Sequence, residues 1–399
     1  MISRLQALGD LVQRRQDVVR GTQWAVVSLY GVLMLGPVLA LATDPHGRVF
    51  ARMARFTEAM FWGLWWPAVI VTMMLFGQVW CGLMCPDGLL TETASRHGRA
   101  LKPPAWMRRD GLALALFVLV TFASDATDAH RSHWGTLLTV GTLTLAAVAT
   151  GLVYGRGKRI WCRYLCPAGS LFSLLARCAV LHFRVDRQRW DTAPKPVPRA
   201  VECPLLLDVR RLISNEKCNM CARCSGHRGA VELAARPPGS EIATLQDGDA
   251  RGWDAAGISY VLIGLGYGGA IGHGDWRLIA ALTLGVGSFT AAMLAIAALG
   301  RRALAIRLAY GLIPLGGIGL ALGAVEHSFA LLAEAGVQTG AAEAWLRACA
   351  LAIGTAWSGW LLLRLTADLE PARRATARTV SAVAIAALAL FYQFAPSFV

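Results

Sequence analysis

Long apolar stretches alternate with short polar and basic segments along most of this chain. Nine of them are apolar enough to be candidate helices across a hydrocarbon core ~30 Å thick. The third is short, and the seventh contains Pro314 and several glycines, so we expect it to kink. The pattern predicts an all-α polytopic membrane protein with about nine transmembrane helices. The stretches lie near residues 22–42, 58–79, 110–126, 134–155, 255–272, 277–299, 305–332, 343–365 and 377–396.

The composition excludes an ordinary soluble protein. Of the 399 residues, 55% are hydrophobic, and the mean hydropathy is +0.48. Residues 1–21 are polar and basic, and the first apolar run lacks a small-x-small cleavage site, so we expect it to stay as an uncleaved anchor. Three parts are predicted: a four-helix membrane domain (1–155), a cytoplasmic segment (156–253) and a five-helix membrane domain (254–399).

Lysine and arginine are distributed unevenly between the predicted loops. If the N-terminus is cytoplasmic, 33 of the 39 basic residues fall on the inner side of nine helices. The net charge of +14 then reports topology and attraction to anionic membrane lipid, and it is no evidence for nucleic-acid binding. The basic residues left on the outer side are Arg48, Arg52, Arg55, Arg131, Arg277 and Arg347.

The segment 156–253 contains a cysteine pattern typical of an iron–sulfur site. Cys203 is followed by Pro204, and Cys218, Cys221 and Cys224 form a C-x2-C-x2-C run. In a two-cluster ferredoxin each such run supplies three ligands, and the fourth comes from the Cys-Pro of the other motif. By this rule the four cysteines form one complete ligand set for a single [4Fe–4S] cluster. With few apolar residues, the segment is expected to depend on that cluster for its fold.

Ligands for a second ferredoxin cluster are missing, since Arg228 stands where a tail cysteine would follow Cys224. A zinc site with His227 as the fourth ligand is an alternative, although zinc ribbons usually carry two separated C-x2-C knuckles. Disulfides fit poorly, because three cysteines at helical-turn spacing have the wrong geometry. The cations Lys217, Arg223 and Arg228 would offset the charge of an anionic cluster.

A second cysteine motif occurs twice in the first half of the chain. Cys81 and Cys85 follow the second apolar stretch, and Cys162 and Cys166 follow the fourth, each within W-C-x3-C-P-x-G. The (i, i+4) spacing puts both sulfurs of a pair on one helical face, and the proline disfavours helix at the residue before it. Since both pairs fall on the cytoplasmic side, we expect the four thiols to converge.

Three interpretations of this repeat stay open. The four thiols could ligate a second [4Fe–4S] cluster, they could be a redox-active dithiol site or take part in quinol chemistry, or they could be small interface residues without chemistry. Cys178 and Cys349 have no partner in sequence and lie in apolar stretches, so we expect both to be buried.

W-C-x3-C-P pairs after two helical hairpins, followed by a ferredoxin-like cysteine array, resemble the membrane-bound polyferredoxin family. That family includes the quinol-dehydrogenase membrane subunit of periplasmic nitrate reduction and the membrane regulator of nitrous oxide reductase. The resemblance covers roughly residues 20–240. It implies a bacterial inner-membrane protein that passes electrons between the quinone pool or a cytoplasmic donor and a periplasmic acceptor. This chain departs from the family in having one ferredoxin ligand set and five additional helices.

Ionisable residues of the last five helices gather at the predicted outer face, among them His273, Asp275, Glu326 and His327. A haem held by His273 and His327, a quinone pocket and ordinary solvated helix ends are the alternatives. Two classes of function follow for the whole chain. It is either an electron carrier, as a redox subunit with or without its own turnover, or a redox-sensing regulatory or assembly factor for a periplasmic metalloenzyme.

The charge asymmetry predicts that the C-terminus is outside the cytoplasm. A fluorescent reporter that folds only in the cytoplasm should stay dark when fused after Val399. The same reporter fused to a chain truncated after Asp249 should fluoresce, because that residue ends the inner segment. Fluorescence from the full-length fusion would show that the helix count or the orientation is wrong.

Overall fold

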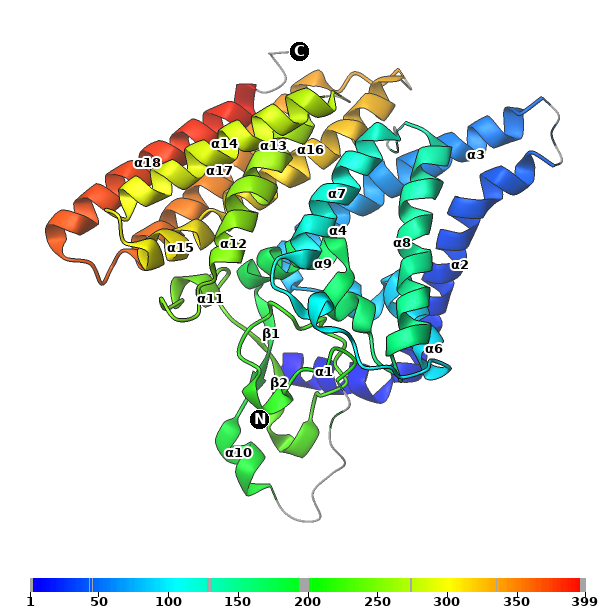
Figure 1. Ribbon diagram of the computed structural model, residues 1–399, viewed down its shortest axis with the longest axis horizontal. Coiled ribbons are helices and arrows are strands. Elements are labelled where there is room, and N and C mark those ends of the chain that lie inside the picture. The colour runs from blue at the N-terminus through cyan, green and yellow to red at the C-terminus, as the bar shows by residue number, and fades with distance from the viewer. Residues whose placement is uncertain are drawn as a thin grey trace. The chain divides into compact units, whose positions relative to one another are not determined.

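The computed structural model describes residues 3–42, 44, 46–127, 129, 131–193, 201, 203–272, 275–334 and 336–394 (Figure 1). The chain forms two compact units. The first comprises residues 1–57, 75–117 and 132–238, and the second comprises residues 58–74, 118–131 and 239–399. Both units therefore combine segments that are far apart in the sequence.

Among the described residues, eight helices are long and apolar enough to cross a membrane, which confirms a helical polytopic membrane protein. The expected third span is present as the shorter helix α7 (Leu112–Ala126). Two of the eight are continuous runs that contain a π-helical stretch. The eight are α2 (Gln16–Ala40), α3–η1–α4 (Arg48–Glu58, Ala59–Trp65, Trp66–Phe76), α8 (His133–Tyr154), α12–η7–α13 (Gly252–Ala256, Gly257–Leu265, Gly266–Gly272), α14 (Trp276–Ala297), α16 (Ile313–Glu334), α17 (Gly340–Leu365) and α18 (Pro371–Phe394).

The interruption expected near Pro314 is a break between two helices. The apolar stretch divides into α15 (Arg302–Tyr310) and α16, with Pro314 as the second residue of α16. Proline suits this position because its missing N–H is one that a first helical turn leaves unpaired. The next free amide, that of Leu315, donates to the Ser358 hydroxyl at 3.1 Å.

In the second unit, the helices form a bundle whose tight packing depends on small residues. α16 packs against α17, α17 against α18, and α18 against α14, and these helices run side by side in Figure 1. At Gly319 on α16, a Cβ atom would lie 2.3 Å from the ring of Tyr392 on α18. The hydroxyl of Tyr392 donates to the Ile263 carbonyl of η7 at 3.2 Å.

In the first unit, α2 and α8 pack around the short helix α6 (Pro86–Arg96). Gly151 lets α8 approach α6, because a Cβ there would lie 2.5 Å from the Thr91 carbonyl oxygen. The first unit contains four further short helices, in the segments that flank α6 and α8. They are α5 (Val79–Leu83), η2 (Ala105–Arg108), η3 (Trp161–Leu165) and α9 (Pro167–Leu175), which runs into η4 (Ala176–Cys178).

The segment after α9 is built on a two-stranded antiparallel sheet. β1 (Leu181–Val185) pairs with β2 (Val231–Ala235), and α1 (Arg4–Arg14) packs against β2 (Figure 1). The Ser225 hydroxyl donates to Asp10 of α1 at 2.8 Å, which ties the N-terminus to this segment. Its remaining short helices are α10 (Arg187–Thr192), η5 (Val209–Arg211) and η6 (His227–Gly229), and α11 (Ser240–Ala243) follows in the second unit.

This small sheet has an apolar core that the sequence pattern does not reveal. Phe183, Val209, Val231 and Leu233 are buried together and surround the loop that carries Met220. The proline-rich connector expected at Pro194, Pro196 and Pro198 lies outside the described residues.

Candidate functional site

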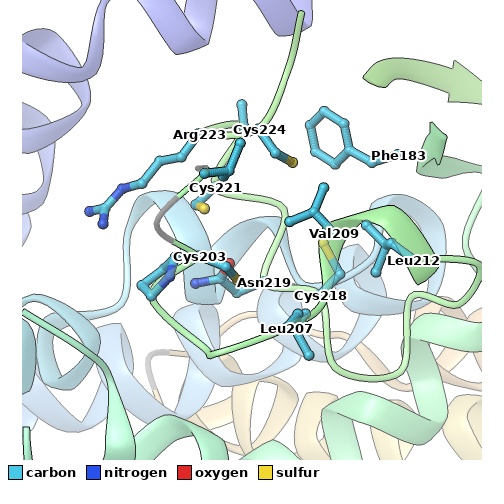
Figure 2. Close-up of a pocket in the computed structure, with 13 residues that line it drawn as sticks. Phe183, Cys203, Leu207, Val209, Leu212, Cys218, Asn219, Cys221, Arg223 and Cys224 are labelled. Carbon is cyan, nitrogen blue, oxygen red and sulfur yellow. The ribbon is translucent and has the colours of Figure 1, made fainter. Parts of the chain in front are cut away.

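The four cysteines of the ferredoxin-like motif line one pocket of the first unit. Its empty volume, including space open to solvent, is about 360 Å³. Figure 2 shows Cys203, Cys218, Cys221 and Cys224 around this space. Cys218 and Cys221 are buried, and the other two are partly exposed. The structure therefore brings together the predicted ligand set, although its two halves are 15 residues apart in the sequence.

The loop that carries three of these cysteines has an unusual backbone. Met220 and Ala222, which lie between the cysteines, adopt left-handed conformations with φ of 53° and 59°. Such angles are costly for residues with a side chain and collect at functional sites. The backbone N–H groups of Met220 and Arg223 donate to the sulfurs of Cys218 and Cys221 and lower their pKa values. A loop of this kind turns its amides towards an anion.

Burial opposes this effect and dominates it. It raises the pKa of Cys218 to about 12 and also raises the pKa of Cys221 and of Cys224. These groups are therefore protonated thiols at neutral pH unless a cation takes the place of the protons. Metal ions deprotonate the thiols that coordinate them, so the set is suited to a metal cofactor.

The two W-C-x3-C-P-x-G motifs adopt similar local structures, a short α-helix in the first and a short π-helix in the second, which supports the internal repeat. Cys81 lies in α5 and Cys162 in η3, and each short helix ends before the second cysteine. The N–H of Cys85 donates to the Trp80 carbonyl at 2.9 Å, and the N–H of Cys166 donates to the Trp161 carbonyl, also at 2.9 Å.

The second cysteine of each pair caps the N-terminus of the next helix. Cys85 has φ −64° and ψ 121° ahead of α6, and Cys166 has φ −58° and ψ 115° ahead of α9. The prolines that follow are the first helical residues, where their missing N–H costs nothing. The spacing predicts that the two sulfurs of a pair share one helical face. They do not, because the first helix ends before the second cysteine and the proline after that cysteine begins a new helix.

The four thiols of the repeat lie within electrostatic range of one another. The pKa of Cys81 is raised by burial first, and then by Cys85, Cys166 and Cys162. Burial likewise raises the pKa of Cys85 to about 11 and that of Cys166 to about 12. The pairs therefore converge, as the repeat predicts.

Helix N-termini moderate the burial of two of these thiols. The backbone N–H groups of Asp87 and Gly88 lie near the Cys85 sulfur and offset part of the rise in its pKa, and those of Ala168 and Gly169 do the same for Cys166. The positive end of a helix favours an anion, so α6 and α9 both stabilise a thiolate at the same place.

A buried ion pair lies between the two cysteine sites. Arg159 is fully buried, and its Nε donates to Glu92 Oε2 at 2.8 Å. Arg223 Nη2 donates to the same carboxylate at 2.7 and 2.9 Å. Arg96 and Arg20 lie 3.6 and 3.8 Å from it. One carboxylate thus faces four guanidinium groups, which leaves an excess of positive charge beside the thiols.

The two sites also touch through their backbones. A Cβ at Gly82, the residue after Cys81, would lie 1.9 Å from the Asn219 carbonyl oxygen and 2.9 Å from the Cys221 nitrogen. Glutamines of α2 fix the same contact: Gln23 donates to the Gly82 carbonyl at 2.8 Å and Gln16 to the Cys221 carbonyl at 3.2 Å. A glycine is therefore required where the membrane motif meets the ferredoxin-like loop.

Sequence proximity identified one cationic neighbour of the cysteines, Arg223, and missed another. Of the three cations expected beside the run, Arg223 lowers the pKa of Cys221, whereas Lys217 pairs with Glu216 and Arg228 lies over the Trp190 ring. Arg159 was missed, because it lies far from this run in the sequence. Its place three residues before Cys162 was the available signal.

The structure gives no support to the zinc alternative. His227 packs against the Trp190 ring and is not among the residues that line the cysteine pocket. Within the described ranges, no three His, Cys, Asp or Glu side chains are close enough together to hold a single metal ion. A cubane carries each thiolate on a different iron and so separates the sulfurs more widely than a tetrahedral zinc does.

The remaining candidates are spread over both units. Cys178 is buried as expected, but Cys349 is exposed on α17, because it lies on the outward side of a helix whose apolar surface is lipid-compatible. His327 Nε2 lies 3.4 Å from Glu58, and Arg347 pairs with Glu326. Of the two histidines considered for a haem, His273 lies outside the described residues.

Comparison with known proteins agrees with the cysteine geometry. A 4Fe-4S binding domain family matches residues 58–104 and 136–188, the segments that contain the two repeated motifs. An uncharacterized protein of Methanocaldococcus jannaschii is 28% identical over 42% of this chain and 68% of its own length. The regulatory protein NosR of Pseudomonas aeruginosa is 25% identical over 40% of this chain and 25% of its own.

A third relative is the methylamine utilization ferredoxin-type protein MauN of Methylorubrum extorquens. It is 28% identical over 44% of this chain and 62% of its own length. The chain thus spans about two thirds of the archaeal and Methylorubrum relatives and a quarter of NosR. No solved structure matches it.

The contact at Gly82 yields a stability prediction. Gly82→Ala should lower the thermal unfolding midpoint of the detergent-solubilised protein, because the new methyl group must displace the Asn219 backbone; overpacking of this kind costs about 1–3 kcal/mol. Gly31→Ala is the matched control, since nothing lies within 4 Å of a Cβ there. Tryptophan fluorescence during heating measures both. Equal midpoints for Gly82→Ala and the wild type would contradict the contact.

Proposed function

Since this chain belongs to the family of membrane-bound, ferredoxin-type 4Fe–4S proteins, we propose that it passes electrons through two [4Fe–4S] clusters between a quinone or cytoplasmic donor and a periplasmic acceptor. One cluster would be held by Cys203, Cys218, Cys221 and Cys224. The other would be held by the two repeated motifs. Iron–sulfur clusters supply one-electron chemistry without a substrate bond being made or broken.

The observation that carries this proposal is the convergence of eight cysteines as two sets of four within one unit. The family match falls on the repeated motifs and not on the ferredoxin-like run, which supports a cluster at the repeat. Backbone amides already donate to sulfurs in both sets. Such hydrogen bonds favour thiolates over thiols and so favour the form that binds iron.

The contact between the sites supports a direct electron path. The peptide after Cys81 lies against the peptide that joins Asn219 to the loop of Cys221. The two clusters would therefore lie close together, with no layer of water between these two backbone segments. Membrane-length helices and the bias of basic residues support placing both clusters near the inner surface of a bacterial inner membrane.

The similarity to NosR favours a second candidate function. Its name describes a regulatory protein, so the same clusters could sense redox state or support the maturation of a periplasmic metalloenzyme. The two functions differ in turnover. An electron carrier is reduced and reoxidised repeatedly by its partners, whereas a sensor changes its redox state without catalytic flux.

Reaction with quinones separates the two functions. Protein reduced anaerobically should be reoxidised by a water-soluble quinone analogue at a rate that rises with quinone concentration, as followed by the visible absorbance of the clusters. Reoxidation that occurs only over hours would favour the sensor. Partner proteins of the periplasm would then be sought by their effect on the same rate.

Iron analysis tests the cluster assignment. Anaerobically purified wild-type protein should contain about eight iron and eight sulfide per chain, as two [4Fe–4S] clusters require. Cys221→Ser should lose the iron of one cluster and Cys166→Ser that of the other, while Cys178→Ser should lose none, because Cys178 belongs to neither set.

Four irons per wild-type chain, all of them lost in Cys221→Ser, would contradict the second cluster. The repeated motifs would then act as dithiols, which exchange electrons by forming and breaking a disulfide.

A further inference from the structure

One residue of the first unit contacts segments of both cysteine sites. The side chain of Arg159 donates from Nη1 to the Cys81 carbonyl at 2.9 Å. Its backbone N–H donates to the carbonyl of Pro204, the neighbour of Cys203, at 2.8 Å. It also precedes Cys162 by three residues. A single arginine is therefore hydrogen-bonded to the first motif and to the ferredoxin-like segment, and it lies three residues before the first cysteine of the second motif.

The guanidinium group of Arg159 has one donor nitrogen for which no described residue provides an acceptor. Its Nε is taken by Glu92 and its Nη1 by Cys81, but its buried Nη2 has no hydrogen-bond partner among the described residues. Leaving a buried donor without an acceptor is energetically unfavourable. The side chain is completely buried, so water cannot supply the acceptor from bulk solvent. This arrangement is suited to an anionic acceptor that belongs to neither Glu92 nor the backbone.

Thiols of both sites lie within reach of this charge. Arg159 lowers the pKa values of Cys81, Cys85 and Cys162 in the repeated motifs, and that of Cys221 in the ferredoxin-like loop. Glu92, the carboxylate that pairs with Arg159, is shared with Arg223, Arg96 and Arg20, and Asp87 adds one further negative charge near the repeated motifs. An anion on each side of Arg159 would therefore balance the excess positive charge.

We infer that Arg159 is a positioning residue shared by two iron–sulfur clusters, whose reduction potentials it raises together, with Glu92 as the opposing charge. This inference rests on the proposed function. Reduction adds a negative charge to a cluster, and a fixed cation nearby stabilises the reduced form. The cation therefore raises the midpoint potential, and a fixed carboxylate lowers it. Because Arg159 lies between the sites, both midpoints should respond to it.

The test is a redox titration followed by EPR, with iron counted in the same samples. Arg159→Gln should shift both midpoints to lower potential, since it removes the charge. Arg159→Lys should leave them near the wild-type values, since it keeps the charge. Glu92→Gln should shift both midpoints upward. Opposite directions for the two neutral variants are a result that loss of packing alone would not produce.

Arg177→Gln is the matched control. Arg177 is also buried and forms a 2.7 Å ion pair with Glu216, but it is not one of the four arginines that face Glu92. It should leave both midpoints unchanged. If Arg159→Gln loses its iron, the upward shift of both midpoints in Glu92→Gln decides in favour of the inference.

Unchanged midpoints in an iron-replete Arg159→Gln, a shift of only one signal, or unchanged midpoints in Glu92→Gln would overturn it. A wild-type protein with a single EPR signal would overturn the inference together with the second cluster of the proposed function. That failure is visible before any variant is made, so the two failures are distinguishable.

Discussion

A carboxylate buried among four arginines determines how the cysteine-bearing segments of this protein meet. Glu92 is only 3% exposed, and a charge so far from water must be paired. Its partners come from separate parts of the chain: Arg159 precedes the second repeated motif, Arg223 lies inside the ferredoxin-like loop, and Arg20 belongs to α2. Satisfying one carboxylate therefore brings together segments that are up to 203 residues apart, from Arg20 to Arg223.

The repeated motif holds thiols at the end of a membrane helix. A tryptophan carbonyl closes the last turn, the proline starts a new helix, and the second cysteine is left at the positive end of that helix. Two copies of this device face each other. These cysteines are partly exposed, but desolvation still raises the pKa values of their thiols, and a metal ion could replace the protons.

The membrane helices and the grouping of the cysteines could be predicted from sequence, for separate physical reasons. Apolar stretches long enough for a bilayer are easily recognised, and eight of the nine correspond to helices of membrane-spanning length among the described residues, although the seventh begins later than expected. Cysteine spacing relates directly to the geometry of a cluster, so residues as distant as Cys203 and Cys218 could be assigned to one pocket. The convergence of the two pairs also followed from their repetition, since equivalent motifs take equivalent positions.

The supporting residues could not be predicted in this way. Glu92 and Gly82 belong to short helices with no pattern of their own, and their roles come from contacts with residues more than 60 positions away. Lys217 and Arg228 were expected to compensate the charge because they are near the cysteines in sequence. In the structure they contact Glu216 and Trp190, and Arg159 lies near the thiols instead. Cys349 was expected to be buried and is exposed, since an apolar neighbourhood in sequence does not distinguish the lipid-facing side of a helix from its packed side.

The central claim is that two clusters lie side by side at the contact between Gly82 and the Asn219–Cys221 loop. The most direct measurement is the EPR spectrum of the fully reduced wild-type protein, compared with partially reduced samples. Neighbouring paramagnetic clusters should interact, so full reduction should broaden and split the signals seen when only one cluster is reduced. A fully reduced spectrum equal to the sum of two independent signals, or a single signal throughout, would contradict the account.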